Sequence, residues 1–150
     1  MTFGGQPLIE AEAVLAAALP EEGCALLLGT TASPQWQVRA IWPCLNRWQP
    51  ALERRQRFAI DPREQLLAQK WARPRGWQLL GSLHSHPASA PLPSGLDESL
   101  AVRPCLQLIA APAGPSWTLR AWWLGDHPAD PGGGGGPDPI EVPIAAGCAG

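Results

Sequence analysis

Residues 77–97 read WQLLGSLHSHPASAPLPSGLD, and this stretch carries the most informative pattern of the chain. Its apolar first part predicts a β-strand that runs as far as His84, and Pro87 marks the strand end because proline cannot extend a sheet ladder. Along a strand, residues two apart project from the same face. We therefore expect His84 and His86 to converge on one point, while Ser85 points the other way. A strand end that opens into a loop is a favoured place for a functional site.

Asp97 is the residue best placed to complete a metal site with the two imidazoles. Catalytic zinc usually takes three protein ligands of the His or Asp/Glu type and leaves a fourth position open. The loop 87–93 is long enough to fold back, and Ser94 is expected to cap a short helix that reaches about Val102. The alternative interpretations are two surface histidines and a plain capping box, Ser94-x-x-Asp97. That capping box is compatible with the metal site, because a capped helix start would hold Asp97 rigidly.

The rest of the chain alternates between helical and strand patterns. An apolar stripe with proline in the first turn predicts a helix over residues 7–19. Asp61 as N-cap, followed by Pro62, predicts a second helix that stops at Pro74. Continuous or alternating apolar residues predict further strands at 24–29, 35–42, 57–60, 105–111 and 117–124. Together these elements predict an α/β fold, a single domain with a mixed β-sheet flanked by helices.

Composition excludes several classes of protein. The chain has 150 residues and a formal net charge of −2, which fits one domain and argues against a nucleic-acid-binding platform. No apolar run is long enough for a membrane span, and the N-terminus lacks the features of a signal peptide. The four cysteines form no C-x-x-C pair, so neither a zinc ribbon nor a thioredoxin-type motif is expected. These features predict a cytoplasmic protein with reduced thiols.

The composition changes near the C-terminus. We expect residues 1–126 to form the domain and residues 127–150 to form a flexible tail rich in Gly and Pro, with five consecutive glycines at 132–136. Residues 140–144 either return as an edge strand or remain loose. His127 is expected to be a solvated loop residue without a role.

The histidine segment and its surroundings resemble a known family. His84-x-His86-Pro87, followed after the loop by Ser94-x-x-Asp97, is similar to the zinc-binding signature of the JAMM metalloproteases, which carry the MPN or Mov34/JAB domain. The family also has a glutamate upstream of an apolar strand, and its spacing to the following Cys and Gly selects Glu22. A solvated glutamate before a strand is the ordinary alternative for this residue. The resemblance extends over about residues 8–124 and is closest to the compact bacterial branch.

This resemblance implies a fold, a cofactor and a reaction. The fold would be a single MPN/JAB-like domain with a cytidine deaminase-like architecture. His84, His86 and Asp97 would hold Zn²⁺, Glu22 would act as general base, and the Ser94 hydroxyl would donate to the oxyanion of the intermediate. The expected activity is hydrolysis of a peptide or isopeptide bond at the C-terminal tail of a ubiquitin-like or sulfur-carrier protein.

Two other functions compete with this one. A non-catalytic MPN module that retains zinc would serve as a scaffold for a partner protein. A zinc hydrolase of small amides, or a deaminase, is the third hypothesis. The deaminase signature needs a P-C-x-x-C segment, and the sequence has Pro104-Cys105 with Leu108 in place of the second cysteine.

Overall fold

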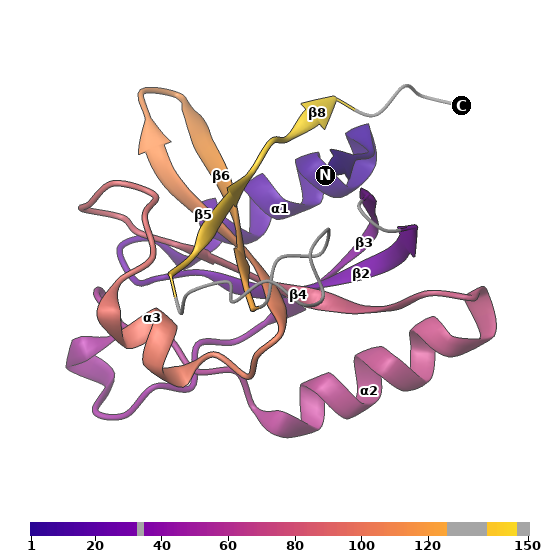
Figure 1. Cartoon of the computed structure of the whole chain (residues 1–150). Helices are drawn as coiled ribbons and strands as arrows, with labels where there is room; N and C mark the ends of the chain where they lie inside the picture. The colour runs from indigo at the N-terminus through magenta and orange to yellow at the C-terminus, as the bar shows by residue number, and fades with distance from the viewer. Residues whose placement is uncertain (33–34, 126–137, 147–150) are drawn as a thin grey trace.

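The computed structural model describes residues 1–32, 35–125 and 138–146. These residues form a mixed sheet of eight strands in the order β7-β6-β5-β4-β2-β3-β1-β8. Figure 1 shows α1 in the curve of this sheet, with α2 and α3 on the other side of β4. The strands are β1 (Thr2–Phe3), β2 (Cys24–Ala32), β3 (Gln35–Cys44), β4 (Gln78–Ser85), β5 (Cys105–Ala113), β6 (Ser116–Leu124), β7 (Ile140–Val142) and β8 (Ala145–Ala146). The predicted α/β class and mixed sheet are confirmed.

The centre of the sheet consists of β2, β4 and β5. β2 runs antiparallel to β3 and β4, whereas β4 runs parallel to β5. Residues 24–29 are all buried, as the continuous apolar run predicts for a strand covered on both faces. One apolar cluster lies between the sheet and α1, and a smaller one lies between the sheet and α2. β4 is therefore held on both edges and both faces before it reaches the histidines.

Local signals in the sequence determine where the helices begin. α1 (Gly5–Ala18) carries Pro7 in its first turn, and α2 (Pro62–Ala72) begins after Asp61, whose carboxylate accepts the backbone N–H of Arg63 at 2.9 Å. α3 (Gly95–Leu100) is shorter than the predicted helix and begins after Ser94. Two 3₁₀ turns, η1 (Ala51–Glu53) and η2 (Arg73–Arg75), flank α2 in the sequence.

The segment 138–146 connects the two edges of the sheet. β7 pairs with β6 at one edge, and after two residues β8 pairs with β1 at the other. The N-terminal ammonium of Met1 donates to the Pro143 carbonyl at 2.7 Å, and Ala145 N–H donates to the Met1 carbonyl at 2.8 Å. Residues 140–142 thus form an edge strand, whereas the glycine run and His127 lie outside the described residues.

The predicted strand at 57–60 is wrong. These residues have no strand partner, and the side chain of Asn46 takes two of their backbone hydrogen bonds. Its Nδ2 donates to the Arg57 carbonyl at 2.8 Å, and its Oδ1 accepts the Ala59 N–H at 3.3 Å. The Ala59 carbonyl accepts the N–H of Arg47 at 2.8 Å. The segment is a loop tied by one amide.

Gly81 provides a test of how tightly β4 packs against β5. A Cβ at this position would collide with the carbonyl oxygen of Leu106, its partner in β5. We expect Gly81→Ala to lower the free energy of unfolding by roughly 1–3 kcal/mol or more, as overpacking does. Gly5→Ala, at an open position at the start of α1, should leave it unchanged or raise it slightly. Urea titration measures both, and equal stabilities would contradict the close approach.

Candidate metal centre

The end of β4 brings His84 and His86 together. Their Nε2 atoms lie 3.1 Å apart, as the period of two predicts. His84 is completely buried, and its backbone is paired with Cys24 in β2 and Ile109 in β5. His86 lies just beyond the strand, where its N–H donates to the Ala110 carbonyl at 2.8 Å. The two rings are therefore carried by the most constrained part of the sheet.

Asp97 reaches the two imidazoles from the first turn of α3. Its Oδ1 lies 3.4 Å from the Nε2 of His84, and its Oδ2 lies 3.4 Å from the Nε2 of His86. Ser94 forms the predicted capping box with Asp97: Ser94 N–H donates to Oδ2 at 2.7 Å, and Asp97 N–H donates to the Ser94 Oγ at 3.1 Å. The helix cap therefore fixes the position of the carboxylate.

The three side chains fit a divalent metal ion. Zinc bonds of about 2.0–2.1 Å in a tetrahedron place ligand atoms about 3.3 Å apart. The two Nε2 atoms are 3.1 Å apart, and each lies 3.4 Å from a different oxygen of Asp97. His86 Nδ1 bonds the Ala90 carbonyl at 2.9 Å, which leaves Nε2 free to coordinate. Two imidazoles and one carboxylate are a donor set that zinc accepts. His84, His86 and Asp97 thus form a group able to hold a metal.

The protonation states of His84 and Asp97 suit coordination, whereas His86 must give up any bound proton to act as a ligand. Burial lowers the pKa of His84 more than Asp97 raises it, so this imidazole is neutral. Burial also opposes the charge on His86, but contacts with Asp97 and the Ala90 carbonyl shift its pKa above the ordinary value. Burial raises the pKa of Asp97, yet its contacts with both histidines and Ser94 bring it well below its usual range. Asp97 is therefore ionised at any physiological pH.

Glu22 lies buried beside this group. Its carboxyl is only 4% exposed, and it interacts electrostatically with His86 and Asp97. Burial raises its pKa to about 7, with a further upward contribution from Asp97 and an opposing one from His86. A carboxyl group with a pKa near 7 is suited to take and return a proton at physiological pH. The structure thus places the glutamate selected by spacing near the metal ligands.

The Ser94 hydroxyl has a different partner from the one expected. It donates to Asp97 Oδ2 at 2.6 Å and accepts from the Asp97 N–H. In this arrangement its proton is directed at the carboxylate and not toward an incoming substrate. A role at the oxyanion would require this hydrogen bond to open.

Comparisons with known proteins agree with this geometry. The model for prokaryotic homologues of the JAB domain matches residues 7–125. The chain belongs to this family. It is 30% identical to a protein from Desulfitobacterium hafniense of known solution structure, with a TM-score of 0.79 and coverage of 97% of this chain and 92% of that one. A protein from Salinibacter ruber gives 27% identity and a TM-score of 0.67, with coverage of 99% and 92%.

A third structure supports the fold of this JAB domain. The JAB1/MPN domain protein from Archaeoglobus fulgidus is 17% identical and has a TM-score of 0.55, with coverage of 97% and 95%. No curated protein shows significant similarity to the chain. In the described residues of this JAB domain, none of the helices has the length and apolar character needed to cross a membrane.

Three residues at the site were given no role by the sequence analysis. Ser85, between the two histidines, accepts the Gly23 N–H on its Oγ at 2.8 Å and donates its own N–H to the Gly23 carbonyl at 3.0 Å. Asn46 donates to the Glu22 carbonyl at 3.1 Å. Ser85 and Asn46 therefore fix the backbone directly after Glu22. A serine facing the start of the adjacent strand was a usable signal, whereas the role of Asn46 depends on contacts distant in sequence.

Phe58 is the third such residue, and it stacks on His84. The two ring centroids are 4.4 Å apart and the planes are inclined by 19°. Among the described residues, Nδ1 of His84 has no hydrogen-bond partner. Histidines that bind metals usually have their orientation fixed by a hydrogen bond at the second nitrogen. In this JAB domain we expect the aromatic stack to take over that function.

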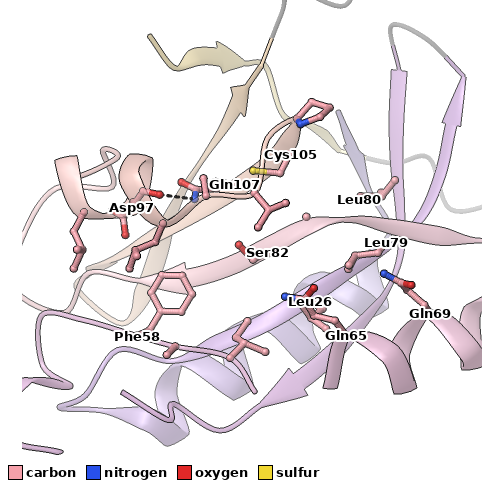
Figure 2. Close-up of a pocket in the computed structure, with 18 residues that line it drawn as sticks. Leu26, Phe58, Gln65, Gln69, Leu79, Leu80, Ser82, Asp97, Cys105 and Gln107 are labelled. Atoms are coloured by element: carbon pink, nitrogen blue, oxygen red, sulfur yellow. Dashed lines mark hydrogen bonds between the residues drawn. The ribbon is translucent and has the colours of Figure 1, made fainter. Parts of the chain in front are cut away.

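A cavity of about 480 Å³ adjoins the metal ligands. It lies between α2, α3 and the first half of β4, and Phe58 and Asp97 are part of its wall. Figure 2 shows Gln65 and Gln69 on α2 at one side and Gln107 on β5 at the other. The Nε2 of Gln107 donates to the Asp97 carbonyl at 3.5 Å, whereas its buried Oε1 has no partner among the described residues. The cavity therefore offers uncharged hydrogen-bonding groups beside apolar walls.

The Phe58 stack leads to a prediction about metal affinity. Phe58→Leu removes the ring that orients His84, and we expect the affinity for zinc to fall by about 10–100-fold, the range seen when a ligand loses its supporting contact. Phe58→Tyr keeps the ring and should retain the affinity. Competition with a chromogenic chelator measures both values. Equal affinities for wild type and Phe58→Leu would show that the stack does not orient the ligand.

Proposed function

We propose that this JAB-domain protein is a zinc-dependent metallopeptidase or isopeptidase. Its substrate would be a peptide or isopeptide bond at the C-terminal tail of a ubiquitin-like or sulfur-carrier protein. One observation carries this proposal: the ligand atoms of His84, His86 and Asp97 lie within 4.8 Å of one another, beside a buried Glu22 whose pKa is about 7. The adjoining cavity supports it, because the exposed amides of Gln65 and Gln69 and the apolar wall can contact a bound peptide.

The chain's own residues account for the proton movements of such a hydrolysis. Zinc bound to the three ligands would supply Lewis acidity toward a water molecule and the scissile carbonyl. The Glu22 carboxylate accepts a proton from the attacking water and returns it to the leaving amine. The Ser94 hydroxyl, once released from Asp97, donates to the oxyanion. Burial of these groups excludes bulk water and strengthens each interaction.

Metal content is the first test of this proposal. The purified wild-type protein should contain zinc in equimolar amount by elemental analysis, and Asp97→Ala should reduce it to background because two imidazoles remain as the only ligands. Because Asp97 is buried, circular dichroism should confirm that the variant folds, and His86→Ala serves as a second ligand variant. A folded wild-type protein that contains no zinc under metal-replete conditions would rule out the proposal.

Turnover is the second test, and it separates Glu22 from the ligands. Glu22→Gln should keep the zinc but lose at least about 100-fold in kcat, the usual contribution of a general base. Suitable substrates are peptide fusions to the C-terminus of each ubiquitin-like protein encoded by the same genome, incubated with and without a chelator. Full activity of Glu22→Gln would reject Glu22 as the base. Zinc binding without cleavage of any fusion would favour the non-catalytic scaffold.

A further inference from the structure

The basic residues of this chain gather in one segment. Residues 47–75 contain eight of the 11 Lys and Arg residues but only three of the 13 Asp and Glu residues, so their formal charge is +5 and that of the rest of the chain is −7. The segment comprises η1, α2, η2 and the loop between η1 and α2. The small net charge of the whole protein therefore conceals a strongly polarised surface.

These charges are available to a partner. Seven of the eight basic side chains are exposed, and Arg54 is half-buried. Within the described part of the chain, Arg57 alone among the eight forms an ion pair, with Glu53 at 3.3 Å. The two side chains of this ion pair are each 44% exposed, so water screens their attraction. The positive charge of the segment is thus largely uncompensated by its own carboxylates.

Exposed apolar side chains lie among the basic ones. Leu52 of η1 is 93% exposed, and Leu66 and Leu67 of α2 are 68% and 52% exposed. Arg63, Leu67 and Lys70 are three or four residues apart and share the side of α2 that faces away from the buried Ala68 and Ala72. We call residues 47–75 with these side chains the basic face. It also includes Trp71, which is 36% exposed, and Arg and Trp are enriched at protein–protein interfaces.

The basic face borders the metal centre. Arg54 accepts the N–H of Glu22 on its carbonyl at 2.8 Å, and Phe58 stacks on His84. Figure 1 shows this segment along the lower side of the molecule, running past the end of β4 and continuing into α2. A protein seated on the basic face would therefore have its surface next to the metal ligands, and a tail leaving that surface can enter the site.

We propose that the basic face docks an acidic protein and that this protein is the substrate whose tail is cleaved. The inference rests on the proposed function for the identity of the partner as substrate, whereas docking itself needs no turnover. A nucleic acid is a less suitable occupant, because a long polyanion would also meet the −7 charge of the remaining chain. It would also leave Leu52, Leu66 and Leu67 without apolar contacts.

Charge reversal on the basic face tests the docking directly. The background is Glu22→Gln, so that a bound substrate stays intact. The variants are Arg55→Glu, Arg63→Glu and Arg73→Glu, singly and combined; Arg39→Glu, outside the face, is the control with the same charge change. The probes are the ubiquitin-fold proteins encoded by the same genome, purified individually, and binding is followed by fluorescence anisotropy at low and physiological salt.

We expect the more acidic probes to bind more tightly, with affinity that falls as salt increases. The triple variant should bind at least about tenfold more weakly, whereas Arg39→Glu should bind like its parent. Absence of binding to every acidic probe, or equal affinity of the triple variant, overturns the proposal. Tighter, face-dependent binding of an RNA oligonucleotide overturns it in favour of nucleic acid. Face-dependent dimerisation in sedimentation overturns it in favour of a second copy of this chain.

The two hypotheses fail separately in these experiments. If an acidic probe binds more weakly to the triple variant but is not cleaved by wild type, the docking proposal is supported and the peptidase proposal is rejected. If wild type and a triple variant that retains Glu22 cleave the substrate with the same KM, the peptidase proposal is supported and the docking proposal is rejected. A raised KM with unchanged kcat in that triple variant supports both.

Discussion

The carboxylate of Asp97 is the group on which the rest of the site depends. It is only 8% exposed, and burying an ionised carboxylate is unfavourable unless several donors surround it. Two donors come from Ser94, at 2.7 and 2.6 Å, and two imidazole nitrogens lie 3.4 Å away. Because the same group closes the cap of α3 and contacts the end of β4, it joins the helix to the sheet across the loop 87–93. The contacts with Ser94 and the two imidazoles that keep Asp97 charged therefore also hold its carboxylate against His84 and His86.

Glu22 is fixed to this centre by the sheet. Ser85 exchanges two hydrogen bonds with Gly23, so the residue between the two histidines determines where the chain lies directly after Glu22. β4 is itself held between β2 and β5, and the segment 138–146 connects the two edges of the sheet. His84 on β4 and Glu22, two residues before β2, are thus carried by neighbouring strands, and Asp97 meets the histidines from α3. Side chains placed in this way need little rearrangement to act together.

Features that depend on nearby residues could be predicted from the sequence, and those that depend on distant ones could not. The convergence of His84 and His86 follows from strand geometry, and the capping box follows from a spacing of three residues. β1 and β8 were not predicted, because strands of two residues exist only through their pairing with each other and with β3. The strand predicted at 57–60 was wrong because the side chain of Asn46, more than ten residues away, bonds the backbone groups that a neighbouring strand would otherwise bond. The stack of Phe58 on His84 has no local signature at all.

The loop tied by Asn46 shows how recognition and chemistry can be joined without regular structure. Arg57 of this loop is exposed on the basic face, and the next residue, Phe58, packs on His84. A loop normally moves too much to connect a surface with a buried ligand. Here one amide side chain donates to the carbonyls of Glu22 and Arg57 and accepts the N–H of Ala59, so the surface, the base and the metal ligand share one anchor. The loop must therefore keep one conformation for both the surface and the site to keep theirs.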